Sequence, residues 1–133
     1  NFHLLCPTER EARIALGDSH NGLEVIAHKL IDITSANNLV FKLGGDGFIC
    51  YQRQSSDEPI VRQYFPALSV RPTDVTGAGD SLLATVAHSL GMGSTMFEAA
   101  ALAACAAAIS VQTVGNIPVS LEQISTFIKQ RKL

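Results

Sequence analysis

The sequence predicts an α/β domain built from layers of strands and helices. Short apolar runs typical of strands alternate with helical patterns up to residue 65, and only helical patterns follow Asp74. Of the 133 residues, 47% are hydrophobic and 17% are charged, a composition that supports a sizeable core. The net charge of −2 provides no basic excess, so neither nucleic acid nor a membrane surface is expected as a partner.

The first part of the chain is expected to alternate between strands and helices. Pro7 ends a short apolar strand, and a turn at Asn37–Asn38 separates a helix from the next strand. The glycine-rich residues 44–47 predict a tight turn that joins two strands into a hairpin. The expected elements are strand 2–6, helix 8–16, helix 23–33, strand 39–43, strand 48–52, an exposed loop 53–59 and strand 60–65.

The last part of the chain is expected to be helical. A first helix carries one apolar face and ends at Gly91. Thr95 and Glu98 form a capping-box pattern before an alanine-rich helix, whose small side chains predict close packing against a flat surface. Ser120 and Gln123 repeat that pattern before the final helix. The apolar face of the first helix comprises Leu82, Leu83, Val86, Ala87 and Leu90.

The cysteines and the apolar segments indicate the cellular compartment in which the protein is expected. Cys6, Cys50 and Cys105 lie far apart and form no C-x-x-C pair, so they are expected to be buried, reduced thiols. The longest apolar stretch falls well short of the roughly 20 residues that a membrane span requires. Together these observations predict a cytoplasmic protein. The four histidines show no spacing typical of a metal site.

The segment Asp74-Val75-Thr76-Gly77-Ala78-Gly79-Asp80 is the most informative motif, because an amphipathic helix follows it at once. Gly77 and Gly79 allow a tight turn and a close approach of a ligand to the main chain. The unpaired N–H groups of the helix start, together with the helix dipole, favour an anion such as phosphate. Asp80 then suits a general base acting on an alcohol that attacks a phosphoryl group.

A structural interpretation of the same residues is simpler. An Asp in the first turn stabilises a helix by itself, and Gly-Ala-Gly can be an ordinary loop. For an isolated G-x-G-D we would favour that interpretation. The full string, with two Asp, one Thr and two Gly in register, favours function.

The string from Asp74 to Asp80, continued by Ser-Leu-Leu-Ala, resembles the C-terminal signature of the PfkB, or ribokinase-like, carbohydrate kinases. The resemblance implies that Asp80 deprotonates the sugar hydroxyl. It also implies that the amides of Gly77, Ala78 and Gly79 form the anion hole for the transferred phosphoryl group.

Two further implications concern metal ions. Asp74 and Thr76 fall where some relatives bind a monovalent cation such as K⁺. Cys6-Pro7-Thr8-Glu9-Arg10-Glu11-Ala12 is similar to the family segment P-N-x-x-E-A, in which the acidic residue, here Glu11, organises Mg²⁺ and the nucleotide phosphates through water. Thr8 stands where Asn is usual, and Thr8 with Glu11 is also a plain capping box.

Two other segments match the nucleotide-binding part of the family. Lys42-Leu43-Gly44-Gly45-Asp46-Gly47 resembles a strand–turn–strand whose backbone passes the ATP phosphates, so Lys42, Gly44 and Gly47 are candidate ATP contacts. The alanine-rich helix and the loop through Gly115 resemble the region that borders the adenine, with Gly115 as a candidate contact to nucleotide or cation. Ordinary hairpin turns and close helix packing explain the same residues without a ligand.

The resemblance assigns residues 1–133 to the C-terminal, nucleotide-binding part of a Rossmann-like, three-layer α/β/α kinase domain. The abrupt start on Asn1 agrees with a chain cut from something longer, without the N-terminal half that carries the sugar site and lid. The implied ligands are ATP, Mg²⁺ and a sugar. The last two helices look most like a heptose-phosphate kinase domain.

We expect ATP-dependent phosphorylation of a sugar or sugar-phosphate hydroxyl from the intact protein, and no activity from this chain alone. Alternatives are a non-catalytic nucleotide-binding fragment or degenerate relative, and a kinase for a nucleoside or vitamin alcohol. A homo-oligomer of the full-length protein is left open.

Overall fold

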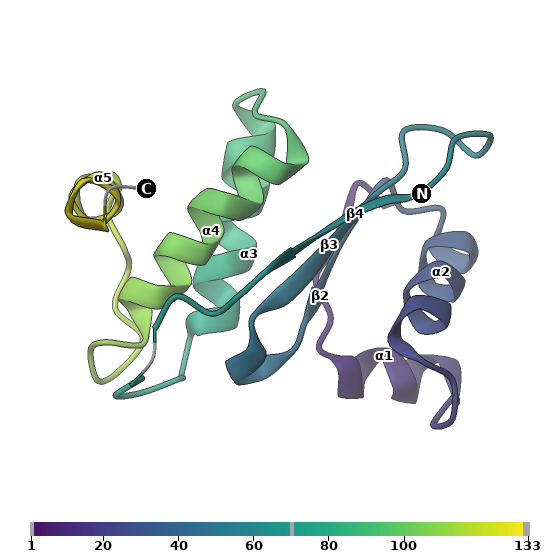
Figure 1. The fold of residues 1–133 in the computed structure, drawn as a ribbon, viewed down its shortest axis with the longest axis horizontal. Coiled ribbons are helices and arrows are strands. Elements are labelled where there is room, and N and C mark those ends of the chain that lie inside the picture. Colours follow the sequence, from purple (N-terminus) through teal and green to yellow (C-terminus); the bar gives the residue numbers. More distant parts are fainter. Residues whose placement is uncertain (1, 70, 132–133) are drawn as a thin grey trace. The chain divides into compact units, whose positions relative to one another are not determined.

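The computed structural model describes residues 2–69 and 71–131. The chain divides into two compact units, Asn1–Phe65 and Pro66–Leu133, called here the N-terminal and the C-terminal unit. Figure 1 shows their helices and strands in chain order. Each unit contains one group of the residues that the sequence singled out, so each is described by itself.

The N-terminal unit contains a four-stranded mixed sheet, in the order β1-β2-β3-β4 among the described residues. β1 runs parallel to β2, and the remaining neighbours are antiparallel. The expected hairpin of residues 39–52 is therefore confirmed, with Val40 opposite Cys50. The elements of this unit are β1 Leu4–Leu5, α1 Glu9–Leu16, α2 Leu23–Thr34, β2 Asn38–Lys42, the 3-10 turn η1 Gly44–Asp46, β3 Phe48–Gln52 and β4 Val61–Phe65.

Helices α1 and α2 lie on the same side of this sheet (Figure 1). The apolar face of α2 packs on alternate residues of β2 and on the ring of Tyr51 in β3, because alternate side chains of a strand point to the same face. All residues of β2 before Lys42 are nevertheless buried, as the continuous apolar run predicted. The core members are Ala12, Ile26, Ala27, Leu30, Ile31, Leu39, Phe41 and Tyr51.

A polar network ties β3 and β4 to α2. Glu24 of α2 accepts a hydrogen bond from the Tyr51 hydroxyl at 2.7 Å and forms an ion pair with Arg62 of β4 at 2.6 Å. The Tyr51 side chain is fully buried, and burial, followed by the hydrogen bond to Glu24, raises the pKa of its hydroxyl well above the usual range. The network gives the exposed strand β4 a specific attachment to the helix.

The structure corrects the expected turn at Asn37–Asn38. Asn38 is the first residue of β2, where it pairs with Leu4 and with Gln52. Its side chain is buried and donates to the His3 carbonyl at 2.9 Å, so an Asn that looked like a turn former supports strand pairing. The first strand is also shorter than the predicted 2–6, since only Leu4–Leu5 pair with β2.

The C-terminal unit is helical from Ala78 onward, as predicted, and consists of α3 Ala78–Gly91, α4 Met96–Ser110 and α5 Leu121–Arg131. Figure 1 shows α3 and α4 side by side. The capping box at Thr95 is confirmed, with both the Thr95 side chain and the Glu98 carboxylate bonded to backbone N–H groups. Ser120 and Gln123 make the same reciprocal bonds at the start of α5, at 2.8 and 3.2 Å.

The alanine-rich helix α4 is packed on several faces. The backbones of α3 and α4 lie close, as the small alanine side chains of α4 allow. On another face, Ile124 and Phe127 of α5 pack against α4. Arg131 donates to the Leu68 carbonyl at 2.8 Å and stacks on the Phe127 ring, which fixes α5 to the segment that precedes α3. The α4 residues of this cluster are Cys105, Ala106 and Ala108.

The cysteines of the structure are free thiols, with Cys50 and Cys105 buried and Cys6 half-buried. Burial raises the pKa of Cys6 to about 11 and that of Cys50 to about 12. Within residues 2–69 and 71–131, no helix has the length and apolar character needed to cross a bilayer.

Candidate functional site

The turn that starts α3 is built around Gly77. This residue precedes the helix with φ 78° and ψ −4°, a left-handed conformation that a β-carbon disfavours. The N–H groups that follow lie at the helix end, where no acceptor exists within the helix. No described residue accepts a hydrogen bond from the N–H of Gly77 or Gly79, whereas Ala78 donates to the Val75 carbonyl at 3.3 Å. Gly77 and Gly79 therefore present available donors.

Asp80 lies in the first turn of α3, three residues after Gly77, and its side chain is exposed. No hydrogen bond or ion pair joins its carboxylate to the described part of the chain. A carboxylate at a helix N-terminus is stabilised by the helix dipole, and one that is not engaged elsewhere can accept a proton from an incoming hydroxyl.

Asp74 holds the segment before α3 to the loop after α4. One carboxylate oxygen accepts from the Thr76 N–H and the other from the Gly115 N–H, both at 2.9 Å. The N–H groups of Thr73 and Asp74 in turn donate to the Val111 carbonyl at 2.7 and 3.1 Å. The Gly115 N–H, followed by that of Thr76, lowers the pKa of the Asp74 carboxyl below its usual range.

Two side-chain contacts strengthen this junction between the segment before α3 and the loop after α4. The Asn116 carboxamide packs on Gly77, so a β-carbon at position 77 would lie 2.6 Å from Asn116 Cγ. The Ser81 hydroxyl in the first turn of α3 is 3.4 Å from the buried Ser110 hydroxyl at the end of α4. The structure thus brings together Asp74, Thr76, Gly77 and Gly115, which the sequence had singled out separately.

Sequence reasoning missed the part played by Asn116, Ser110 and Val111. The available signal for Asn116 and Ser110 was a polar side chain next to Gly115 and another at the end of the alanine-rich helix. No sequence signal pointed to the Val111 carbonyl, because every residue type supplies a backbone carbonyl.

The second group lies in the N-terminal unit, where the parallel strands β1 and β2 end. The Lys42 N–H donates to the Pro7 carbonyl at 2.9 Å, and Thr8 forms a β-bridge with Lys42. The capping box is present: the Thr8 N–H donates to Glu11 at 2.7 Å and the Glu11 N–H to the Thr8 hydroxyl at 3.2 Å. Ligands of open α/β sheets bind at the carboxyl ends of parallel strands, which is where Thr8, Glu11 and Lys42 meet.

Glu11 remains exposed although it caps α1. The backbone N–H of Thr8, followed by its hydroxyl, lowers the pKa of the Glu11 carboxyl, and the charge of Lys42 adds to this effect. The side chain is therefore a solvent-facing carboxylate at neutral pH.

The turn between β2 and β3 follows Lys42 directly. Gly47 adopts φ 93° and ψ −135°, a region open in practice only to glycine. The Leu43 N–H donates to the Gly47 carbonyl at 2.8 Å and closes the turn, which leaves Gly44 exposed at its tip. The Tyr64 hydroxyl of β4 also donates to the Asp46 carbonyl. The tight turn predicted for residues 44–47 is confirmed.

Each of the two groups contains a single carboxylate as a candidate metal ligand. Among the described residues, no three His, Cys, Asp or Glu side chains gather as a metal site. Glu11 is a single exposed carboxylate, which suits Mg²⁺ held largely through water. Each Asp74 oxygen accepts one N–H and keeps a further acceptor site, so a cation contact is compatible with the bonds to Thr76 and Gly115.

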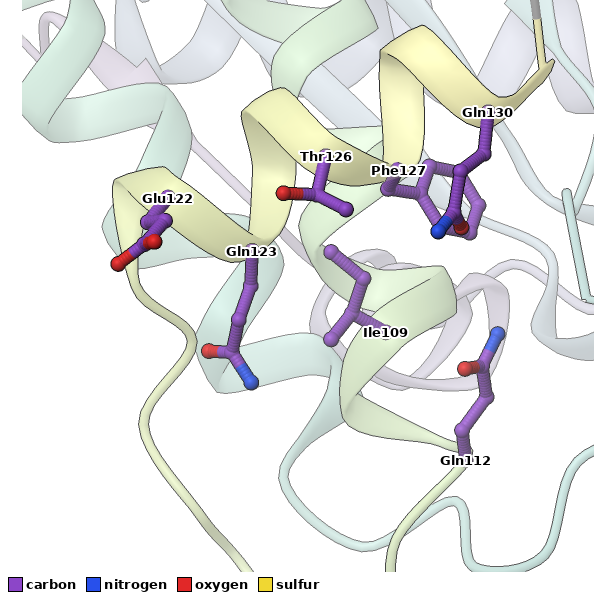
Figure 2. Close-up of a pocket in the computed structure, with 7 residues that line it drawn as sticks. All are labelled: Ile109, Gln112, Glu122, Gln123, Thr126, Phe127 and Gln130. Carbon is purple, nitrogen blue, oxygen red and sulfur yellow. The ribbon is translucent and has the colours of Figure 1, made fainter.

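A separate open groove of about 340 Å³ lies where the C-terminal end of α4 meets α5. Figure 2 shows the Gln112, Gln123 and Gln130 side chains around Ile109, with Phe127 beside them. None of the candidate catalytic, ATP or metal residues lines this groove; its lining is Ile109, Gln112, Glu122, Gln123, Thr126, Phe127 and Gln130.

The mixed sheet with its helices defines an α/β fold, and a glycine turn with an acidic residue starts its first long C-terminal helix. Comparison with known proteins defines the family. Residues 1–124 match the profile of the pfkB family carbohydrate kinases, and the chain belongs to this family.

Two curated relatives illustrate the match. The bifunctional protein HldE of Campylobacter fetus is 35% identical over 132 residues, which is 97% of this chain and 27% of that protein. An uncharacterized sugar kinase of Buchnera aphidicola is 30% identical over 127 residues, 94% of this chain and 39% of the relative. The chain therefore spans well under half the length of these relatives.

Solved structures show the same fold. Ribokinase of Thermotoga maritima superposes with a TM-score of 0.79 at 28% identity, over 96% of this chain and 42% of that one. Ribokinase of Arabidopsis thaliana, solved with ribose and ATP, gives a TM-score of 0.76 at 24% identity, over 95% of this chain and 40% of its own. The α/β fold predicted from the sequence is thus confirmed as ribokinase-like.

Proposed function

We propose that these residues are the C-terminal, nucleotide-binding part of a kinase that transfers phosphate from ATP to a sugar or sugar-phosphate hydroxyl. The observation that carries the proposal is the start of α3, where the exposed Asp80 carboxylate stands beside the available N–H donors of Gly77 and Gly79. A base and an anion-binding turn at adjacent positions are what phosphoryl transfer to an alcohol requires.

The proposed chemistry is a direct in-line transfer. Asp80 accepts the proton of the sugar hydroxyl as its oxygen forms a bond to the γ-phosphorus of ATP. The bond from that phosphorus to the bridging oxygen breaks, and ADP leaves with the electron pair. The N–H groups of Gly77 and Gly79 stabilise the negative charge on the transferred group, and Ala78 joins them by releasing the Val75 carbonyl.

The remaining candidates are proposed as ligand contacts. Glu11 would hold Mg²⁺ through water, and this ion would neutralise charge on the ATP phosphates. Thr8, Lys42, Gly44 and Gly47 are proposed to contact ATP, the glycines through their backbone. Lys42 supplies a positive charge suited to phosphate.

The loop after α4 completes these assignments. Gly115 is proposed as a further ATP contact, and Asp74 with Thr76 as ligands of a monovalent cation such as K⁺. We place the protein in the cytoplasm, on the ground that its three thiols are free.

The deciding experiment compares the wild type with Asp80→Asn in the full-length protein that contains these residues. Asn is nearly isosteric but cannot take the proton, so turnover should fall by roughly 10²-fold or more. Mg-ATP affinity, measured by isothermal titration, should stay within about threefold of the wild type. Asp57→Asn, in an exposed loop, is the matched control and should behave as wild type.

Three results would change the assignment. An Asp80→Asn protein that keeps most of its kcat contradicts the role of Asp80. A wild type that binds Mg-ATP but phosphorylates no sugar favours a non-catalytic nucleotide-binding relative. If the protein instead phosphorylates a nucleoside or a vitamin alcohol, the proposed mechanism is retained but the phosphate acceptor is not a sugar.

A further inference from the structure

Asn116 lies at the centre of a three-residue turn that the rest of the junction holds in place. The Ile117 N–H donates to the Gly115 carbonyl at 3.2 Å, which closes the chain tightly around Asn116. The N–H of Gly115 is itself bound to the Asp74 carboxylate at 2.9 Å. The backbone of Asn116 is therefore anchored on the segment that leads into α3.

The side chain of Asn116 occupies the space that a β-carbon at position 77 would need. An added β-carbon there would lie 2.6 Å from Asn116 Cγ and 3.2 Å from Asn116 Cβ, both closer than ordinary van der Waals contact. Asn116 is exposed overall, so its carboxamide covers the Gly77 backbone from the solvent side.

Glycine is the residue whose backbone is least restricted by its own side chain. At Gly77, with φ 78°, that freedom would let the start of α3 sample conformations in which the N–H groups of Gly77 and Gly79 are oriented differently. A neighbour packed on the α-carbon removes part of this freedom. Asn116 stands in that position, and the Asp74–Gly115 bond keeps it there.

We propose that Asn116 is a positioning residue for phosphoryl transfer, which holds Gly77 by the shape of its side chain and so keeps the anion-binding N–H groups preorganised. This inference rests on the proposed function and adds to it a residue that touches no substrate. Because preorganisation acts on the transition state more than on the bound substrate, loss of Asn116 lowers kcat more than it raises KM.

The first test measures kcat and KM for ATP in the full-length protein, with ADP release followed over a panel of sugars and sugar phosphates that includes D-ribose. Asn116→Ala, which removes the packing atoms, should lower kcat about tenfold and leave KM within about twofold. Asn116→Leu keeps the shape without the polar atoms and should retain kcat within about twofold. Gln54→Ala, which removes an exposed carboxamide from the loop of residues 53–59, should match the wild type.

The second test is independent of turnover and uses the thermal midpoint Tm in a double-mutant cycle. Gly77→Ala should lower Tm in the wild-type background through both its φ of 78° and the clash with Asn116. In an Asn116→Gly background the clash is gone, so the same substitution should lower Tm by less. Gly91→Ala, in open space at the end of α3, should shift Tm equally in both backgrounds.

Each outcome decides the matter. An active wild type whose kcat is unchanged by Asn116→Ala overturns the positioning role while the proposed function stands. A Leu variant as impaired as the Ala variant overturns the argument from shape. Equal Tm losses from Gly77→Ala in the two backgrounds overturn the contact itself. A wild type inactive over the whole panel overturns the proposed function, and with it the positioning role.

Discussion

The carboxylate of Asp74 accepts a hydrogen bond from the backbone N–H of Gly115 at 2.9 Å, across 41 residues of sequence. Its second oxygen accepts the Thr76 N–H, so one side chain satisfies donors from two loops. This bond joins the segment that begins α3 to the loop that leaves α4. The geometry of the glycine turn before α3 thus depends on a partner from a distant part of the chain.

Asp74→Asn should loosen this junction. The carboxamide keeps one acceptor oxygen but turns an NH₂ group toward a backbone N–H, so one of the two bonds is lost. We expect a lower Tm and weaker Mg-ATP binding, measured by thermal denaturation and titration calorimetry. The exposed loop variant Asp57→Asn should change neither.

The same variant tests the pH dependence. Since folding lowers the pKa of Asp74, its contribution to stability is fully present above the unfolded value near 3.9 and is lost as pH falls through the folded value. The Tm difference between wild type and Asp74→Asn should be largest near neutral pH and should shrink in acid. A difference that is the same at pH 7 and pH 3 would contradict the assigned bonds.

Glu11→Gln separates the capping role of Glu11 from its proposed role at Mg²⁺. Gln can also accept the Thr8 N–H, so the unfolding free energy should change by less than about 0.5 kcal/mol. Loss of the charge should weaken Mg-ATP binding severalfold. Glu98→Gln makes the same change in the capping box of α4, where no ligand is proposed, and should leave Mg-ATP binding unaltered.

Thr8 completes that test, because it is the other half of the box. Thr8→Ala should lower the unfolding free energy by about 1 kcal/mol, measured by urea denaturation. Equal effects of Glu11→Gln and Glu98→Gln on Mg-ATP affinity would remove Glu11 from the ligand contacts.

Tyr51→Phe should destabilise the N-terminal unit. The Tyr51 side chain is fully buried, and its hydroxyl donates to Glu24 at 2.7 Å. Loss of the hydroxyl leaves this Glu24 oxygen with one hydrogen bond, from Arg62. We expect a loss of about 1 kcal/mol in unfolding free energy by urea denaturation. Tyr64→Phe removes a hydroxyl from a half-exposed ring and should cost less; the reverse order would contradict the network.

The thiols should react slowly in the folded protein. Burial raises the pKa of Cys6 to about 11, so at pH 8 only on the order of one part in 10³ of it is thiolate. Cys50 and Cys105 are buried and their pKa values are raised as well. Mass spectrometry after iodoacetamide treatment should find little modification in buffer and full modification in guanidinium. Rapid alkylation of Cys50 without denaturant would contradict its burial.

Local patterns allowed much of the fold to be predicted from the sequence. The Thr8–Glu11 and Thr95–Glu98 boxes mark helix starts because their hydrogen bonds span three residues, and the structure contains both. Asn38 shows where such reasoning fails. Its local preference is for turns, yet pairing with β1 and β3 places it in a buried strand, because tertiary contacts override a weak local propensity.

By itself the sequence determined the order of elements, the glycine turn with Asp80 at the start of α3, and the family resemblance that comparison confirmed. These features depend on neighbours in the chain, whose spacing can be read directly. Only the tertiary structure decided that Asp74 binds Gly115, that Asn116 covers Gly77 and that Glu24 joins Tyr51. Such pairs form when separate segments pack together, and hydrophobic spacing predicts that segments pack without specifying which polar atoms meet.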